Sequence, residues 1–419
     1  MKLWQFTDLH LYVRENPAEL NTSPNQTALA QSEEIIDACL AAFLAEPGCD
    51  TLLLTGDLTQ TGHPDEHRAM LEKLRRVQAK GKRVIAITAS HDYKTEGIET
   101  CGKLRRLYAA FGPDSALASY DDGQAFVVQL EPGLRLLCAN DHGREWPAPW
   151  LPWAVERIGQ AKAAGERIFG MTHLPSLPPS PIYPLLEPSS ILCGETVRQL
   201  ANAGLRFMLT GHSHIHNIHP LVTPEGSPYW DINTSALVGW PGKFRVLEIE
   251  GDRVHITSRE IPHIPAFGQA TAREFLQNTF DVVLRNIFEG WMHDYDLFAR
   301  SIGTGISAAR VYRRKRLLKP LGKVVPRLTL GGLGRLLACR IPPEARRLLL
   351  REVLMEVMRN IYAGEEPYGP ETPLGKTFLA YGRRLRFLEK KLGIADFPAF
   401  LLSLLYDDTP DDEVVIALD

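Results

Sequence analysis

Short apolar runs alternate with amphipathic segments along the first part of the chain, and this alternation is typical of an α/β fold. Runs typical of buried strands cover residues 3–7, 51–55 and 83–88. Between them, residues 25–45 and the segment that carries Met70 and Leu74 place apolar side chains at helical spacing. The order of strand, helix, strand, helix, strand predicts right-handed crossovers and parallel pairing of the three strands.

The following stretch, up to residue 260, adds antiparallel features to this alternation. We expect two strands joined at Pro132-Gly133, a helix at 150–164, a strand at 167–171, a helix at 195–203, a strand at 205–210 and antiparallel strands within 229–260. Residues 174–190 are rich in proline and serine, which predicts a loop that forms the rim or lid of a site.

The pattern changes to a purely helical one after residue 264. Thr271 and Glu274 have the spacing of a capping box, and the apolar residues from Phe275 to Trp291 follow at helical spacing. From there to the end of the chain we expect helices. The sequence therefore predicts an α/β domain at residues 1–264 and an all-helical domain at 265–419 that caps a site, dimerises the chain or regulates it.

The composition is that of a globular protein, with 44% hydrophobic and 23% charged residues and a formal charge of −3. No window approaches the run of about 20 uncharged apolar residues that a membrane span requires. A strand-like run begins directly after Met1 and Lys2, so we expect no signal peptide and a cytoplasmic protein. Six cysteines at irregular spacing, without a C-x-x-C pair, indicate neither a disulfide framework nor a thiolate zinc site.

One stretch of the predicted helical domain is strongly basic. Residues 301–360 contain fourteen lysines and arginines against three acidic residues. Such a stretch is compatible with a nucleic-acid or anionic-lipid partner. Its charges stand among leucines, valines and isoleucines at helical spacing, which favours a solvated helix face or an internal docking surface.

Metal-binding side chains follow the predicted strands at several points. They are Asp8, His10, Asp57, His91, His173, His212 and His214. Ligands of open α/β sheets bind beyond the carboxyl ends of the strands, so we expect these side chains to gather in one place. Imidazole and carboxylate together suit Mn, Fe or Zn, whereas Mg or Ca sites use mainly oxygen ligands.

These residues stand in five ordered motifs: D-x-H at 8–10, G-D at 56–57, S-H-D at 90–92, the lone His173 and G-H-x-H at 211–214. In these motifs the sequence resembles the calcineurin-like metallophosphoesterases over roughly residues 1–260. The resemblance implies a two-sheet sandwich flanked by helices (α/β/β/α) with a site for two divalent metal ions.

The resemblance also implies a role for each residue. Carried over by position, it assigns Asp8, His10 and His214 to the first metal, His173 and His212 to the second, and Asp57 to both. His91 becomes the catalytic histidine close to the leaving group, and we expect it to titrate near neutral pH. Two neighbouring cations acidify a bridging water and clamp a phosphoryl group, which implies attack by a metal-bridging hydroxide.

The third motif departs from the family. It is usually G-N-H-D or G-N-H-E, with the Asn oxygen as a ligand of the second metal, but here it is Ala89-Ser90-His91-Asp92. Because serine is shorter, we predict that Ser90 binds the second metal weakly or through a water. Asp141 and His142, which follow another predicted strand, are candidates for contact with substrate or for support of the site.

The favoured function is a metal-dependent phosphoesterase, and among these a phosphodiesterase that resembles the bacterial class III cyclic-nucleotide phosphodiesterases, with a small phosphoester such as a nucleotide as substrate. A nuclease or a phospholipid headgroup phosphoesterase that uses the basic helical stretch is the alternative enzyme. A non-catalytic metal-binding scaffold is the alternative from another class, and the presence of His10, His91 and both G-H-x-H histidines disfavours it. The sequence specifies no oligomeric state.

Overall fold

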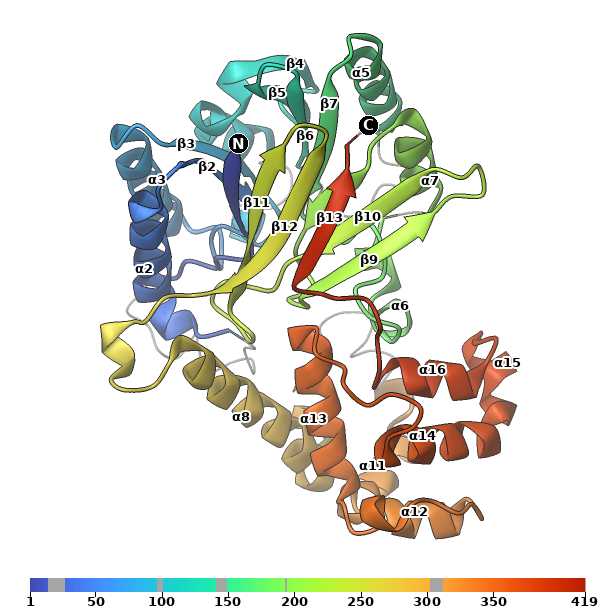
Figure 1. Ribbon diagram of the computed structural model, residues 1–419. Helices are drawn as coiled ribbons and strands as arrows, with labels where there is room; N and C mark the ends of the chain where they lie inside the picture. The colour runs from blue at the N-terminus through green and yellow to red at the C-terminus, as the bar shows by residue number, and fades with distance from the viewer. Residues whose placement is uncertain (14–26, 96–100, 141–148, 193, 302–311, 419) are drawn as a thin grey trace.

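The structure is a computed structural model that describes residues 1–13, 27–95, 101–140, 149–192, 194–301 and 312–418. Two β-sheets face each other at its centre, and a group of helices lies at one end of the sandwich (Figure 1). The candidates Asp141 and His142 lie outside the described residues.

The first sheet has six strands. Their order is β13 (Glu413–Ala417), β12 (Arg253–Glu260), β11 (Lys243–Glu250), β1 (Lys2–Phe6), β2 (Cys49–Thr55) and β3 (Arg83–Ile87). The parallel pairing of β1, β2 and β3 is confirmed, with Trp4 opposite Leu52 and Leu52 opposite Val84. The other half of the sheet is antiparallel.

The second sheet has seven strands. Their order is β4 (Ala116–Tyr120), β5 (Ala125–Glu131), β6 (Leu134–Ala139), β7 (Arg167–Thr172), β8 (Phe207–Thr210), β10 (Pro228–Asn233) and β9 (Asn217–Val222). The strands β6, β7, β8 and β10 run parallel to one another. The predicted hairpin at Pro132-Gly133 joins β5 to β6.

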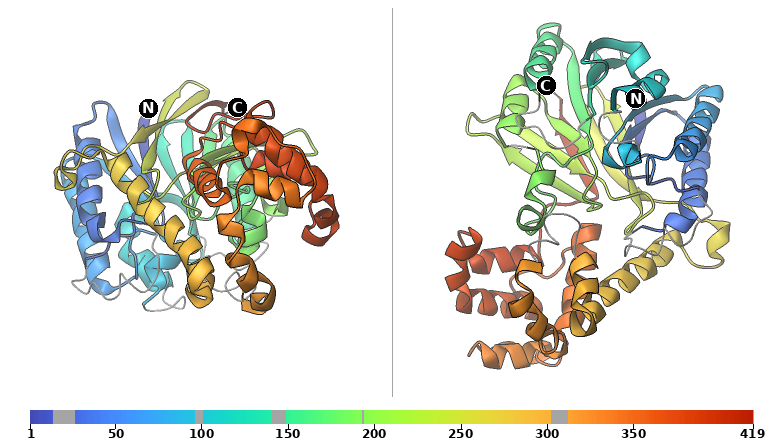
Figure 2. Two further views of the ribbon diagram at one scale, coloured as in Figure 1. Left: turned by 90° about the horizontal axis from the view of Figure 1, so that it is seen from below. Right: turned by 180° about the vertical axis from the view of Figure 1, so that it is seen from behind.

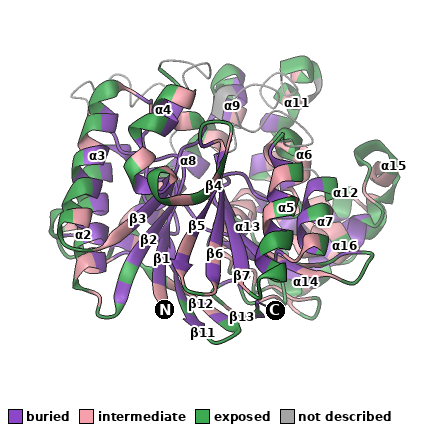
Figure 3. Ribbon diagram, turned by 90° about the horizontal axis from the view of Figure 1, so that it is seen from above, coloured by how far each residue is buried: buried purple, intermediate pink, exposed green. Residues whose placement is uncertain are grey.

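Helices cover the outer face of each sheet. The helices α2 (Ser32–Ala45) and α3 (Pro64–Ala79) lie on the first sheet, and α5 (Leu151–Ala163) and α7 (Gly194–Ala203) lie on the second. In Figure 3 the strands between them are almost entirely buried, while each helix has a buried and an exposed side. Apolar side chains such as Leu53, Phe169 and Leu247 fill the space between the sheets. The predicted α/β/β/α sandwich is confirmed.

The helical region begins with α8 (Ala272–His293), whose N-cap Thr271 forms the predicted capping box with Glu274. It continues with α9 (Tyr295–Ser301), α11 (Lys315–Gly322), α12 (Leu330–Leu336), α13 (Leu350–Ala363), α14 (Pro373–Arg384), α15 (Glu389–Leu392) and α16 (Phe397–Ser403). Two shorter helices, α4 (Cys101–Leu107) and α6 (Tyr183–Leu186), lie in the sandwich. Among the helices of the described ranges, none is long and apolar enough to cross a membrane.

The end of the chain is not helical, which corrects one expectation. Residues Glu413–Ala417 form β13, which pairs antiparallel with β12 at the edge of the first sheet (Figure 1). Ile416 is fully buried between the sheets, whereas its neighbours Val415 and Ala417 are exposed. This alternation with a period of two is the pattern of a strand with one buried face. The division into two domains at residue 264 stays a prediction.

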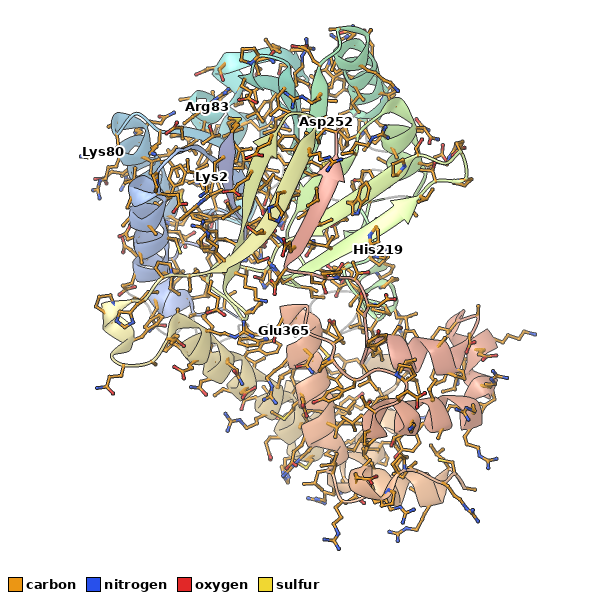
Figure 4. All side chains as sticks on the ribbon, in the orientation of Figure 1. Lys2, Lys80, Arg83, His219, Asp252 and Glu365 are labelled. Atoms are coloured by element: carbon orange, nitrogen blue, oxygen red, sulfur yellow. The ribbon has the colours of Figure 1, made fainter. Side chains whose placement is uncertain are left out.

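The helical region is fixed to the sandwich by buried polar contacts. Lys243 on β11 is buried, and its ammonium group lies 2.9 Å from Asp412 and 3.2 Å from Glu365. Glu365, labelled in Figure 4, follows the end of α13 and points to the sandwich. The views of Figure 2 show the helical region at one end of both sheets. The helical region is therefore attached by specific contacts as well as by the chain.

Candidate metal centre

The predicted ligands come together at the carboxyl ends of strands from both sheets. Asp8, Asp57 and His91 follow β1, β2 and β3, and His173 and the histidines of the G-H-x-H motif follow β7 and β8. Their ligand atoms form three groups within 4.8 Å: Asp8, His10 and His214; His10, Asp57 and His91; Asp57, His173 and His212. Asp57 and His10 each belong to two groups, so the three groups are parts of one centre.

The backbone at this centre is strained. Five of the eight non-glycine residues with positive φ in the described ranges are candidate ligands: Asp8, His10, Asp57, His212 and His214. Non-glycine residues rarely adopt this left-handed conformation, and it persists only where the surrounding structure enforces it. The turns therefore direct these side chains to the centre at a cost in backbone energy.

Two glycines of the motifs are required by close packing. A Cβ on Gly56 would lie 2.8 Å from Nδ1 of His173, and a Cβ on Gly211 would collide with Thr7 and with Asp8. Gly56 also has φ +95°, which other residues rarely adopt. These two positions allow the loops of the two sheets to approach each other closely.

The first group is arranged around one oxygen of Asp8. Its Oδ1 lies 3.5 Å from Nε2 of His10 and 3.3 Å from Nε2 of His214, and the two imidazole nitrogens are 3.1 Å apart. The other oxygen, Oδ2, accepts hydrogen bonds from the Thr7 hydroxyl and the His212 backbone N–H. The hydrogen bonds fix the carboxylate and leave Oδ1 free to bind an ion.

In the group of Asp57, His173 and His212, hydrogen bonds likewise fix one atom of a side chain and leave another as the ligand atom. Nδ1 of His173 donates to the backbone oxygen of Thr55 at 2.8 Å, which leaves Nε2 as the ligand atom, 3.1 Å from Oδ2 of Asp57. Oδ1 of Asp57 accepts from the backbone N–H of His91 at 2.8 Å. The His212 ring lies 5.1 Å from the His173 ring, measured between centroids.

Burial and neighbouring charges set the ionisation of these groups. Burial opposes the charge of Asp8, yet His173 and His214 hold its pKa well below the usual range. Burial likewise opposes protonation of His173, but Asp57 and Asp8 raise its pKa to about 10. Burial lowers the pKa of His10, and it lowers the pKa of His212 to about 4. Neutral imidazoles and ionised carboxylates are the protonation states in which these side chains bind metals.

The centre also contains buried polar atoms without partners. Oδ1 of Asp8 and Nε2 of His173 are inaccessible to solvent and make no hydrogen bond to any described residue. Such atoms are rare in folded proteins, because each loses its hydration without compensation. A metal cation between these two atoms would satisfy both. Because Asp57 and Asp8 raise the pKa of His173, the ring holds a proton here, and this proton supplies the positive charge that the metal would supply. The donor set of nitrogen and carboxylate oxygen fits divalent transition metals.

His91 lies at the edge of this centre and is half-buried. Its Nδ1 is 2.8 Å from the backbone oxygen of Gln60, and the Lys94 ammonium lies 2.9 Å from the ring nitrogens. Burial lowers the pKa of His91 to about 3, with further lowering by His10 and Lys94 and opposition from Asp57. This corrects the expectation that His91 titrates near neutral pH. Lys94 was not identified from the sequence, because only the one-turn helix Ser90–Tyr93 brings it to His91.

Two residues that hold the site loops were also missed. Asp92 is fully buried and accepts hydrogen bonds from the backbone of Thr59 and Ala89 and from the Thr59 hydroxyl, which ties the second motif to the third. Asn140, at the end of β6, accepts from the backbone N–H of Thr88 and donates to Gly123. Asp92 stands inside the third motif and Asn140 directly precedes Asp141, so their position was the available signal although neither was given a role.

Ser90 begins the turn that carries His91, and it is exposed. Among the described residues, its hydroxyl makes no hydrogen bond to a candidate ligand, so its role as a weak ligand stays a prediction. The helical region reaches the site on the opposite side: the backbone N–H of His216 donates to Tyr362 on α13 at 3.0 Å. Ile215 packs in one hydrophobic cluster with Leu330 and Val357. The loop of His214 is thus held between the second sheet and the helices.

Comparison with known proteins identifies a family for the first half of the chain. Residues 1–216 match the family described as calcineurin-like phosphoesterase, and this match contains all five motifs. A search of the curated proteins found no match to this sequence.

Solved structures with a similar arrangement share little sequence with this chain. A dimetal phosphatase from Danio rerio is 14% identical, with 62% of this chain and 96% of that chain covered and a TM-score of 0.46. A purple acid phosphatase from yellow lupin is 11% identical, with 62% and 51% covered and a TM-score of 0.43. A putative 5'-nucleotidase from Staphylococcus aureus is 11% identical, with 68% and 58% covered and a TM-score of 0.38.

Proposed function

This chain belongs to the calcineurin-like phosphoesterase family, and from that premise we propose that it hydrolyses phosphodiesters, with cyclic nucleotides as the favoured substrate class. The family and the ligand groups indicate a metal-dependent phosphoesterase with a dinuclear divalent-metal site. The observation that carries the proposal is the central position of Asp57, which shares a group with His10 and His91 on one side and with His173 and His212 on the other.

In the proposed centre, Asp8, His10 and His214 hold one ion and His173 and His212 hold the second, with Asp57 shared between them. The metals are Mn, Fe or Zn, in keeping with the mixed donor set. When bound, two such ions supply Lewis acidity that lowers the pKa of water and withdraws charge from a phosphoryl oxygen. The second site is the weaker one, because Ser90 replaces the usual Asn ligand.

His91 is proposed as the catalytic residue that handles the leaving group. Its Nδ1 lies 2.8 Å from the Gln60 carbonyl oxygen and its Nε2 lies 2.9 Å from the Lys94 ammonium, so Gln60 and Lys94 hold the ring in place. The imidazole is neutral in the free site because burial lowers its pKa to about 3. An anionic phosphoester beside it raises that pKa, and the protonated ring can then donate to the leaving oxygen. Lys94 adds a positive charge next to the same position.

The preference for diesters is supported by the form of the second motif, G-D-L-T-x-x-G at residues 56–62, which is similar to that of bacterial cyclic-nucleotide phosphodiesterases. The helical region packs on Ile215, directly after His214, and on Tyr183 of α6. It is therefore close enough to select among substrates. The cytoplasmic location stays a prediction.

The proposal is tested by comparing hydrolysis of bis-p-nitrophenyl phosphate and p-nitrophenyl phosphate by the Mn-loaded protein. We expect the diester to have the higher kcat/KM. A higher kcat/KM for the monoester would contradict the diesterase assignment. His219→Ala is a matched control for histidine variants, because His219 lies on β9 outside all three ligand groups and its ring Nδ1 bonds the Pro178 backbone oxygen.

A further inference from the structure

A polar cavity lies in the helical region, away from the metal centre. Its volume is about 320 Å³. It is lined by Thr329, Gly331, Arg335, Cys339, Arg340, Ile341 and Arg346. In Figure 1, α12 and the loop after it lie at the end of the helical region that is far from both sheets. The cavity is thus separate from the strand ends that carry the predicted metal ligands.

The walls of this cavity are built from hydrogen-bonded backbone. Thr329 and Leu349 form an isolated antiparallel bridge, and Gly331 N–H donates to the backbone oxygen of Arg346 at 3.0 Å. On the other side, Cys339 N–H donates to Gly334 at the end of α12. A Cβ on Gly331 would lie 2.8 Å from the Arg346 backbone oxygen, so the close approach of the two walls requires glycine. The cavity is a fixed feature of the fold.

The lining is positively charged and contains no acidic residue. Within the described ranges, Arg335, Arg340 and Arg346 form no ion pair with a carboxylate. Some other cations of the helical region are paired, as Lys315 is with Asp296 and Arg359 with Asp281. Arg346 is also oriented, because its Nε donates to the backbone oxygen of Ile341. Three arginines line one space, so their like charges repel one another, and an anion bound there relieves this repulsion.

We propose that this cavity is a binding site for a phosphate monoester. Guanidinium groups bind phosphate oxygens through paired N–H donors, and several of them favour a ligand with more than one negative charge. The cavity has room for more than a bare phosphate, since sites for small ligands begin at about 300 Å³. The phosphate can belong to a free nucleotide or to the headgroup of a lipid. The proposal does not depend on the activity of the metal centre.

Cys339 provides a local test, because this residue lines the cavity. The full-length protein is treated with iodoacetamide, a neutral reagent, and alkylation of the Cys339 peptide is followed by mass spectrometry with increasing AMP. We expect AMP to slow alkylation of Cys339 in a saturable manner. Alkylation at a rate independent of AMP would overturn the proposal. Phosphate that binds only at the metal centre does not protect this thiol.

Two variants connect the protection to the arginines. Arg340→Ala is expected to raise the AMP concentration for half-protection by roughly 10-fold or more, since a charge-assisted hydrogen bond contributes about 1.5–3 kcal/mol. Arg335→Ala is a second, independent variant. Arg347→Ala is the control, because Arg347 is exposed, stands next to Arg346 and does not line the cavity. Equal protection in Arg340→Ala, Arg335→Ala and the parent protein would contradict the assignment.

The source of the phosphate is decided by a parallel measurement. Vesicles of phosphatidylcholine, with and without phosphatidic acid, replace AMP in the alkylation experiment. Protection by AMP assigns a soluble ligand, and protection only by the vesicles that contain phosphatidic acid assigns a lipid headgroup. Both results support a phosphate monoester site. Protection by neither probe overturns it.

Discussion

The candidate metal centre at the strand ends and the helical region differ in how they hold their charged side chains. In the centre, Asp8, His10, Asp57 and His173 are buried, the other three histidines are half-buried, and five of these seven residues lie in strained backbone. In the helical region the cations come from one stretch of sequence, and Arg335, Arg340 and Arg346 remain exposed. Buried charges need a partner that neutralises them, whereas exposed charges remain hydrated until a ligand arrives. The first arrangement suits permanent metal binding and chemistry, and the second suits reversible recognition.

The two regions meet at a polar junction. Lys243 on the first sheet lies among Asp412, Glu365 and the backbone oxygen of Ala363, and Trp240 donates to the backbone oxygen of Arg359 on α13. The C-terminal strand passes the same junction on its way to the sheet edge. Substitutions in the metal centre, in the junction and in the basic stretch at residues 301–360 are therefore expected to differ in the property that they change, activity or stability, and in the size of the change.

The largest effect is expected for Asp57→Asn. The change keeps the shape of the side chain but removes the negative charge that both proposed ions share, so activity falls by about 10³-fold or more. The measurement is kcat/KM for bis-p-nitrophenyl phosphate at saturating Mn, with circular dichroism as a check on folding. Unchanged activity in this variant would remove the basis for a shared carboxylate.

The next effect concerns His91. Replacing His91 by Ala is expected to lower kcat about 10²-fold for a diester with a poor leaving group, because proton donation to the leaving oxygen is lost. For p-nitrophenyl esters, whose leaving group needs little protonation, the loss is expected to be much smaller. The dependence of kcat on leaving-group pKa is the measurement. An equal loss for both kinds of ester would assign His91 a purely structural or ligand role.

A change at the junction is expected to affect stability more than a similar change in the exposed stretch. Lys243→Ala leaves Asp412 and Glu365 without their buried partner and is expected to cost about 2 kcal/mol of unfolding free energy. The matched variant Lys315→Ala breaks an exposed pair with Asp296 and is expected to cost less than about 1 kcal/mol. Urea unfolding of both variants makes the comparison. An equal loss of unfolding free energy in the two variants would mean that the junction is no more than a surface contact.

The smallest effect is expected for Ser90→Asn, which restores the family's usual third motif. A direct oxygen ligand in place of serine is expected to lower the Mn concentration for half-maximal activity by roughly 10-fold. Titration of metal-free protein with Mn gives this value for both forms. Identical titration curves would show that residue 90 does not set the affinity of the second site.

The meeting of the motifs could be predicted because each candidate ligand directly follows an apolar strand, and the family resemblance carried by those motifs implied the two-sheet sandwich. Contacts between residues that are far apart in the sequence were harder to predict. The five residues Glu413–Ala417 follow an acidic stretch and give little periodicity, so the sequence did not predict the strand that pairing with β12 selects. Lys94 reaches His91 through a turn, and the low pKa of His91 arises from burial, so neither follows from spacing.

The central claim is that the strand ends form a two-metal centre shared through Asp57. Its most direct test is the number of Mn ions bound per chain, measured by mass spectrometry of the metal after dialysis against graded Mn. The parent protein is expected to hold two ions at saturation and to lose one of them first as free Mn falls, and Asp57→Asn is expected to hold at most one. A single ion in the parent at saturation, or two ions held equally tightly by Asp57→Asn, would contradict the account.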